Sequence, residues 1–297
     1  MILKLGQSYS FSGIGRRANQ EDARMPDSDM PSTDSIVFAV CDGVGGQDKG
    51  EVASASVARS IAESTRDLRL DTPVDMSVIE NIMAGCYEEL SHITDDGNRG
   101  MATTLALVIF NRAGCYTVHI GDSRIYQLRP GVGIVFRSKD HSLVSDLVAA
   151  GLLSAEEARN HPRRNVITRC LRVPDPCEEP SQATTSLLSD IRPSDIFLLC
   201  SDGVLESMDE TELVDLLTDQ SRPVAERVET LRQACADNSN DNNTAIVIPV
   251  DSADGASADA AGSVIRTRET SFSLPHIEPT RTVVKKISDM FRKIIRR

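Results

Sequence analysis

Four short apolar runs in this chain each end at an aspartate or begin just after one. The runs are residues 36–41, 116–121, 196–201 and 244–250, and the aspartates are Asp42, Asp122, Asp202 and Asp241. Apolar runs of four to eight residues are typical of buried strands, where an unpaired carboxylate is costly. The sequence therefore predicts that several strand ends bring carboxylates around a shared cation. Because no His or Cys cluster accompanies them, the pattern favours magnesium or manganese over zinc.

Length, charge and cysteine usage limit the class of protein. The 297 residues and their 40% hydrophobic content suffice for one sizeable core with an appendage. A net charge of −12, an aromatic fraction of 4% and the lack of Trp argue against nucleic acid as a partner. Seven cysteines without a CxxC pair indicate reduced, buried thiols. Since neither a secretory signal nor a membrane-spanning apolar stretch is found, the expected location is the cytoplasm.

Strand-like and helix-like segments alternate from residue 35 to about residue 250, as in an α+β fold. The strand-like runs are 35–42, 102–110, 115–121, 124–128, 134–138, 196–201 and 244–250. Helical spacing of apolar residues predicts helices over 47–66 and 75–94 on one sheet face, and over about 209–218 and 223–236 on a second face. The four strands between 102 and 138 have connections too short for crossover helices, so they should pair antiparallel as a meander. The expected layers are helix, sheet, sheet, helix.

Composition changes abruptly after Val250. Residues 251–263 are drawn only from Asp, Ser, Ala and Gly, which predicts a disordered linker over 251–279. Residues 280–297 carry apolar side chains on one helical face and basic ones elsewhere, which predicts a basic amphipathic helix. Residues 281–297 hold seven Lys or Arg and one Asp, a net of +6, so the rest of the chain carries −18. Three docking sites for this helix remain open: a membrane surface, an acidic partner and its own acidic domain.

Six motifs hold the residues that we expect to do chemistry. They are residues 15–23 (GRRANQEDA), 40–46 (VCDGVGG), 121–124 (GDSR), 139–142 (KDHS), 200–203 (CSDG) and 241–244 (DNNT). In the first motif, Arg17 stands a few residues before Glu21 and Asp22, where a phosphate and its metal can be held together. The glycines after Asp42 let the backbone approach a metal closely.

In this order the motifs resemble those of the type 2C metal-dependent serine/threonine protein phosphatases, with a bacterial-like pattern, from about Gly13 to Val250. The resemblance implies an αββα sandwich of two mainly antiparallel sheets, with two Mn²⁺ or Mg²⁺ ions at one end and a third ion in some members. We therefore expect a catalytic domain over residues 1–250, the linker over 251–279 and the basic helix over 280–297.

The resemblance also implies a role for each matched residue. Asp42 would bridge both ions, and Asp202 and Asp241 would complete the shell of the first. Glu21 and the Gly43 carbonyl would serve the second ion, with Asp22 holding its waters. Asp122 would serve the third, weaker ion, and Arg17 would grip the substrate phosphate.

The implied reaction is direct hydrolysis of phosphoserine or phosphothreonine on partner proteins by a metal-bridging water, opposing a Ser/Thr kinase. Two alternatives remain. One is a phosphatase of the same fold dedicated to one regulatory phosphoprotein, such as an anti-sigma-factor antagonist. The other is an inactive pseudophosphatase that serves as a binding module, although every expected metal carboxylate is present.

Two features of the sequence bear on specificity and acid catalysis. Val44 replaces a histidine that some family members carry as a candidate general acid, and His161 is a substitute candidate. Residues 142–164 fit the variable flap beside the active site, which selects substrates in such enzymes.

Overall fold

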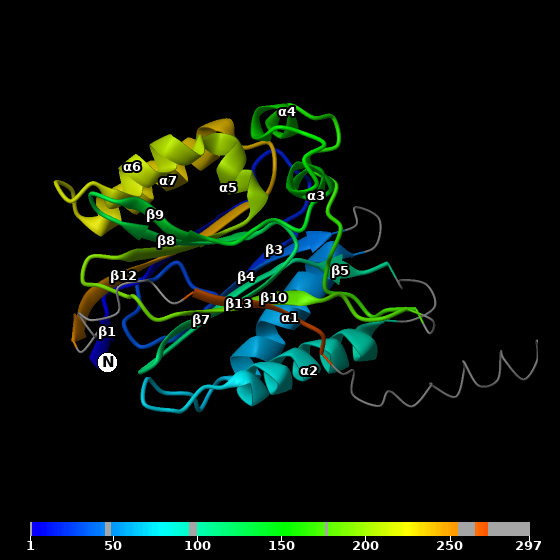
Figure 1. Ribbon diagram of the computed structural model, residues 1–297, viewed down its shortest axis with the longest axis horizontal. Coiled ribbons are helices and arrows are strands. Elements are labelled where there is room, and N and C mark those ends of the chain that lie inside the picture. The colour runs from blue at the N-terminus through cyan, green and yellow to red at the C-terminus, as the bar shows by residue number, and fades with distance from the viewer. Residues whose placement is uncertain (1, 45–48, 95–99, 176–177, 255–264, 273–297) are drawn as a thin grey trace, which may run out of the picture.

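The computed structural model describes residues 2–44, 49–94, 100–175, 178–254 and 265–272. Two β-sheets pack face to face, and helices cover the outer face of each sheet (Figure 1). All the strand ladders are antiparallel. The expected αββα sandwich is therefore confirmed.

The first sheet contains strands from both the beginning and the end of the catalytic region. Its strands run in the order β1 (Ile2–Leu5), β12 (Asn243–Asp254), β11 (Ile196–Cys200), β8 (Arg124–Arg129) and β9 (Gly133–Arg137), with β2 (Tyr9–Gly13) also paired to β12. The central strand β11 is buried at every position. Such a continuous apolar run is what a strand buried on both faces requires.

The second sheet contains the hairpin formed by residues 105–120. Its order is β13 (Ile265–Thr270), β10 (Ala183–Leu188), β7 (Gly114–Ile120), β6 (Leu105–Asn111), β4 (Val37–Val44) and β3 (Asp22–Met25), with β5 (Ala102–Thr103) paired to β4. All seven residues of β6 are buried. Between the two sheets, Phe110 packs edge-to-face on Phe38 and Phe197, with ring centroids 6.2 Å and 4.9 Å apart.

Helices cover each sheet as their apolar spacing predicts. The helices α1 (Gly50–Ser64) and α2 (Met76–Ile93) pack on the second sheet, and α5 (Asp202–Ser207), α6 (Glu210–Thr218) and α7 (Val224–Asn238) pack on the first. Two short helices, α3 (Leu143–Ala149) and α4 (Ala155–Arg159), form the segment that the sequence indicated as a flap. Asp209 begins α6 through a capping box with Glu212, which satisfies two backbone donors.

The expected meander over residues 102–138 is wrong in one respect. The strands β6 and β7 pair with each other, as do β8 and β9, but β7 and β8 belong to different sheets. The chain crosses from one sheet to the other at residues 121–123, where Gly121 has a φ of 101° that favours glycine. Strand patterning does not distinguish a hairpin from such a crossing, because both need only a short link.

The expected disordered linker over 251–279 is wrong where the structure describes it. Residues 251–254 continue β12, and residues 265–270 form β13 on the edge of β10. An edge strand can be polar, because its backbone groups rather than apolar side chains hold it in place. The predicted basic helix over 280–297 lies outside the described residues. Within the described parts of the chain, no helix is long and apolar enough to span a membrane.

Candidate metal centre

The predicted carboxylates gather at one end of the sandwich. Asp22 opens β3 and stands directly opposite Asp42, near the end of β4, in the antiparallel ladder. Asp122 lies in the crossing just before β8, Asp202 is the first residue of α5 after β11, and Asp241 lies two residues before β12. The starts of some strands and the ends of others therefore lie at the same edge of the two sheets, and these side chains lie there together.

The backbone around Asp42 is held by Thr103, at the end of β5, and by the next residue, Thr104. The Asp42 N–H donates to Thr104 Oγ1 (3.0 Å), and the Asp42 carbonyl accepts from Thr104 N (2.8 Å) and Thr103 Oγ1 (2.9 Å). Thr104 Oγ1 also shares a 2.7 Å hydrogen bond with Ser123 Oγ, beside Asp122. Buried hydroxyls thus tie the end of β4, which carries Asp42, to the loop that carries Asp122.

A close approach of three backbone segments places Gly43 next to Glu21. The Gly43 N–H donates to the Glu21 carbonyl (3.0 Å), which also accepts from Ser54 Oγ (2.6 Å) on α1. A Cβ atom on Gly43 would lie 2.4 Å from the carbonyl carbon of Gly50. Only glycine fits there, so β4 can meet the start of α1 and leave the Gly43 backbone at the carboxylate cluster.

Asn242 is a positioning residue that sequence reasoning missed. Its Oδ1 accepts from the Glu21 N–H (2.7 Å), and its Nδ2 donates to the carbonyls of Ile14 and Asn19 (2.9 Å each). One side chain therefore holds the loop that contains Arg17 against the loop that contains Asp241. The motif DNNT was recognised for its aspartate, and the asparagine beside it was the available signal.

Burial dominates the electrostatics of the cluster. It raises the pKa of Asp22 to about 7, against a hydrogen bond from Ser201 Oγ (2.7 Å), and it raises the pKa of Asp122 to about 7 and of Asp202 to about 6. Burial and then the charges of Asp22 and Asp202 raise the pKa of Asp42 well above its usual range. Glu21 shifts in the same direction, first from burial and then from Glu51. Full ionisation of these carboxyl groups is therefore unfavourable unless a cation is bound.

The donor set suits a hard divalent cation. Among the described residues, Asp22 Oδ1 and Asp202 Oδ1 are buried without a hydrogen-bond partner. In the same residues, no three His, Cys, Asp or Glu side chains form a ready-made metal cluster. Carboxylates that face one another repel, so a divalent charge would both draw them together and stabilise their ionised forms. Oxygen donors without thiolate or imidazole match magnesium or manganese.

Arg17 stands at the edge of this cluster. Its Nη2 lies 2.5 Å from Asp241 Oδ2, and its side chain is 58% exposed. The neighbouring Arg16 points instead to Asn240 Oδ1 (3.1 Å). Arg17 is thus the guanidinium that a phosphate group entering from solvent would meet beside the carboxylates.

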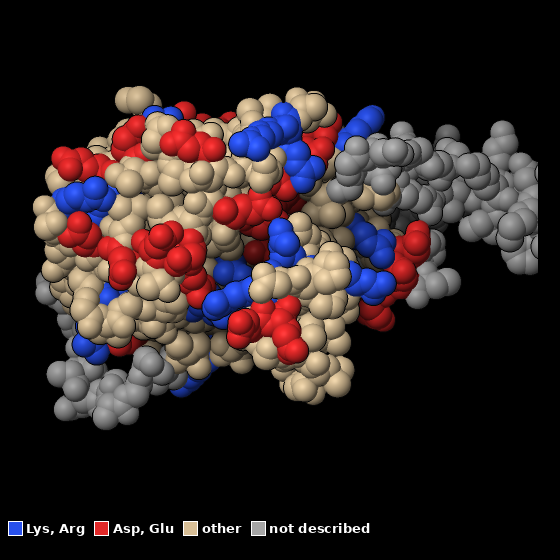
Figure 2. All heavy atoms as spheres, turned by 90° about the horizontal axis from the view of Figure 1, so that it is seen from above, with Lys and Arg blue, Asp and Glu red and all other residues tan. Residues whose placement is uncertain are grey.

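A cleft of about 1040 Å³ opens beside the cluster, between the flap and the helices α5 and α6. Asp122 and Asp202 line it from the sandwich, and Arg159 and Arg164 line it from the flap. Figure 2 shows acidic and basic side chains gathered around a hollow on this side of the molecule. His161 is not among the described residues that line the cleft, and its Nδ1 accepts from the Arg163 N–H (3.1 Å).

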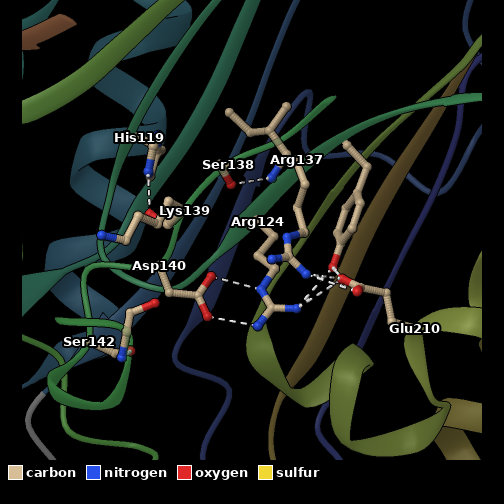
Figure 3. A network of polar contacts seen from close by, with 11 residues as sticks. His119, Arg124, Arg137, Ser138, Lys139, Asp140, Ser142 and Glu210 are labelled. Carbon is tan, nitrogen blue, oxygen red and sulfur yellow. Dashed lines mark hydrogen bonds and ion pairs between the residues drawn. The ribbon is translucent and has the colours of Figure 1, made fainter. Parts of the chain in front are cut away.

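A second network, also missed by sequence reasoning, braces the cleft wall (Figure 3). Arg124 donates two 2.7 Å hydrogen bonds to the two carboxylate oxygens of Asp140. Glu210, at the start of α6, accepts from Tyr126 Oη (2.8 Å) and from Arg137 Nη1 (2.8 Å). Arg124 and Asp140 lie in recognised motifs, but the sequence contains no signal that Glu210 would join them.

The thiols near the cluster have an ordinary packing role. Cys41 and Cys200 are fully buried in their strands. Burial raises the pKa of both thiols. These two cysteines are therefore inert hydrophobes, as the sequence predicted.

The fold and the site define a class of protein: a metal-dependent hydrolase whose carboxylate centre lies at one end of an αββα sandwich. The protein phosphatase 2C family model matches residues 14–239. The chain belongs to this family, and it is a serine/threonine protein phosphatase, as the motifs predicted.

Individual relatives support this assignment. A serine/threonine phosphatase (stp) of Listeria monocytogenes is 30% identical over 224 residues, which cover 72% of this chain and 84% of that protein. The protein phosphatase PhpP of Streptococcus pneumoniae is 34% identical over 202 residues, covering 66% and 77%. The crystal structure of the Mycobacterium tuberculosis phosphatase PstP/Ppp superposes with a TM-score of 0.69 at 30% identity and covers 84% of this chain and 100% of that chain.

The expected metal dependence is confirmed by a solved relative. The catalytic domain of the phosphatase PstP, which is 29% identical with a TM-score of 0.67, was crystallised in complex with two manganese ions. This agrees with the oxygen-only donor set at the end of the sandwich and with the sequence expectation of manganese or magnesium.

Proposed function

We propose that the carboxylate end of the sandwich holds two divalent ions, and that the protein there hydrolyses phosphoserine and phosphothreonine on partner proteins. The observation that carries this proposal is the convergence of Asp22, Asp42, Asp122 and Asp202, from four separate segments, with pKa values raised by burial. Buried carboxylates that are not paired with a basic side chain need a bound cation to balance their negative charge.

The geometry supports a division of ligand roles. After burial, the charges of Asp22, Asp202 and Asp122 raise the pKa of Asp42, so these carboxylates lie near one another. We assign Asp42 to both ions, Asp202 and Asp241 to the first, and Glu21 with the Gly43 carbonyl to the second. Asp22, which accepts from Ser201, would act on the second ion through water, and Asp122, which lines the cleft, would bind a third, weaker ion.

The chain's own residues orient the substrate. When bound, the ions supply Lewis-acid activation of water and neutralise charge on the phosphoryl oxygens. Arg17 would leave Asp241 and donate to two phosphoryl oxygens, which matches the fork geometry of its guanidinium. The phosphate then lies between Arg17 and the carboxylate cluster, and the peptide extends into the cleft beside the flap.

The test is hydrolysis of a phosphothreonine peptide by the full-length protein with manganese, magnesium or EDTA. We expect turnover with either metal and none with EDTA. Asp42→Ala should lose turnover, whereas Asp67→Asn, a change at an exposed aspartate remote from the site, should retain it. Metal-independent turnover, or equal turnover by Asp42→Ala, would refute the proposed site. If the wild-type protein binds a phosphoprotein but never hydrolyses it, the binding-module alternative holds.

We further propose that the enzyme works in the cytoplasm against a Ser/Thr kinase.

We also propose that residues 280–297 dock on an anionic membrane surface. This docking is supported by charge, because the segment 281–297 has a net charge of +6 in a chain whose net charge is −12. Deleting residues 273–297 should abolish co-sedimentation with vesicles that contain anionic lipid and should leave peptide turnover unchanged. Higher turnover after deletion would indicate docking on its own domain, and unchanged co-sedimentation would refute the membrane role.

A further inference from the structure

The strand β13 extends the second sheet beside β10, within reach of the base of the flap. Figure 1 shows the two strands side by side, and their ladder runs from Ala183↔Thr270 to Leu188↔Ile265 without a register shift. Phe272, just beyond the strand, is 3% exposed and packs into the core beneath α1 and α2. The strand is thus anchored at both its backbone and its end, although its own side chains face solvent.

Glu269 of β13 contacts both β10 and the segment that returns from the flap. Its Oε2 forms an ion pair with Arg169, which lies on the segment that returns from the flap. Its Oε1 accepts a hydrogen bond from Thr184 Oγ1 (2.9 Å) on β10. A hydroxyl has one proton, so a Thr184 that donates to Glu269 can meet its other neighbour only as an acceptor.

That other neighbour is His141. Its Nε2 lies 2.9 Å from Thr184 Oγ1, and its Nδ1 accepts from the Gly121 N–H (3.1 Å). The directions of the three bonds agree: Gly121 donates to His141, His141 donates to Thr184, and Thr184 donates to Glu269. This arrangement requires the neutral Nε2–H tautomer of His141. Arg169 Nη1 also lies 3.4 Å from His141 Nε2, a much longer contact than its ion pair with Glu269.

Gly121 is the residue before Asp122, in the crossing between the two sheets. His141 holds this turn twice, because its own N–H also donates to the Gly121 carbonyl (2.9 Å). Its carbonyl accepts from the Thr168 N–H (2.8 Å), and its ring stacks on His119 with centroids 4.7 Å apart. The ring and the backbone of His141 together therefore join the turn at Asp122 to the returning end of the flap.

We propose that Glu269 is a positioning residue: it fixes the tautomer of His141 and thereby holds the Gly121–Asp122 turn at the metal centre. Without an acceptor at position 269, the Thr184 hydroxyl can turn and donate to His141 Nε2. The imidazole then carries its proton on Nδ1, where it opposes the Gly121 N–H, so the turn loses a hydrogen bond. The effect on catalysis rests on the role proposed above for Asp122, whereas the effect on His141 does not.

The test uses the metal-free full-length protein and three variants. Glu269→Ala removes the acceptor, Glu269→Gln keeps an acceptor oxygen without the charge, and Arg266→Ala changes an exposed residue of the same strand. The ¹⁵N shifts of the His141 ring report the tautomer, and hydrogen exchange reports the Gly121 amide. We expect the Nδ1–H form and about threefold to tenfold faster exchange in Glu269→Ala only, since one hydrogen bond is lost.

Turnover adds a second readout. In Glu269→Ala we expect the manganese concentration for half-maximal activity to rise about threefold to tenfold, with Glu269→Gln close to wild type. An unchanged tautomer in Glu269→Ala overturns the proposal. An equal change in Arg266→Ala also overturns the proposal, because the strand rather than the Glu269 side chain would then be responsible. An equal change in Glu269→Gln overturns it as well, because the charge of Glu269 would then be responsible. Because the ring shifts are measured without metal or substrate, they stand even if wild-type turnover fails to appear.

Discussion

Arg17 and Asp241 form an ion pair in which Nη2 lies 2.5 Å from Oδ2. Both residues have other expected partners, a phosphate for the arginine and a metal for the aspartate. The pairing keeps the guanidinium at the cluster when no phosphate is bound, and the hydrogen bond that Arg17 donates to Asp241 raises the pKa of Arg17. In the proposed site, substrate binding would replace the Asp241 carboxylate by a phosphate as the partner of Arg17.

Arg17→Ala should lower kcat/KM for a phosphothreonine peptide by about 10-fold to 100-fold, because charge-assisted hydrogen bonds to the phosphate are lost. Arg16→Ala is the matched control, since Arg16 is adjacent in sequence but contacts Asn240. Its kcat/KM should stay within about twofold of wild type, as for other surface substitutions. Steady-state kinetics at saturating manganese measures both, and equal losses in the two variants would contradict a specific role for Arg17.

Asp202→Asn should separate activity from stability. Removing one charge relieves repulsion in a cluster where burial holds the pKa of Asp202 at about 6. We therefore expect the metal-free variant to be more stable at pH 8 by about 2 kcal/mol, while turnover falls by roughly 10³-fold or more. Urea unfolding in EDTA and peptide hydrolysis in manganese measure the two effects. A variant that is both active and no more stable would show that Asp202 is an ordinary helix cap.

Gly43→Ala tests the close approach of β4 to α1. The new Cβ would lie 2.4 Å from the Gly50 backbone and 2.7 Å from the Glu21 carbonyl, so one of these segments must move. We expect a loss of about 1–3 kcal/mol in unfolding free energy and a large loss of turnover, because Glu21 moves with its backbone.

Gly85→Ala is the control for this change. Gly85 lies inside α2, and its Cβ would meet only serine hydroxyls at 3.2 Å and 3.3 Å. Alanine favours a helix interior by about 1 kcal/mol over glycine, so this variant should be at least as stable as wild type and equally active. Equal thermal unfolding temperatures for the two variants would argue against a tight approach at Gly43.

The sequence predicted the parts of this fold whose pattern is local. Four helices match their expected ranges, namely α1, α2, α6 and α7. A helix with a periodic apolar face must bury that face, and here it does so against a sheet. The carboxylates were found for a similar reason, since a charge at the end of a buried strand needs a partner. These inferences need no knowledge of which strands are neighbours.

Relationships between distant segments were not predicted. Asn242 bonds Ile14 and Asn19, and Glu269 bonds Thr184, across separations that no local pattern encodes. The strand β13 was assigned to a linker because its side chains are polar and exposed, whereas its backbone pairs with an available sheet edge. The crossing at Gly121 was taken for a hairpin for the same reason, because the choice of sheet depends on packing across the sandwich.

The stability of the metal-free protein should fall as pH rises from about 6 to 8. The folded-state pKa values of Asp22 and Asp122 are about 7 and that of Asp202 is about 6, against about 3.9 for an unfolded aspartate. Groups with raised folded-state pKa values bind more protons in the folded protein, so their stabilisation is lost as pH rises through those values. Below about pH 6.5 the buried His119 and His141, whose pKa values are lowered, act in the opposite direction, because the unfolded histidines become protonated.

Urea unfolding in EDTA at pH 6, 7 and 8 measures this dependence, and the same series with saturating manganese supplies the comparison. Manganese should remove most of the slope, because a bound divalent cation favours the ionised carboxylates at every pH in the series. Chelation should therefore destabilise the protein far more at pH 8 than at pH 6. A metal-free protein whose stability is constant or rises from pH 6 to pH 8 would mean that these carboxylates are ionised at ordinary pKa values, and that their burial does not prepare the site for a cation.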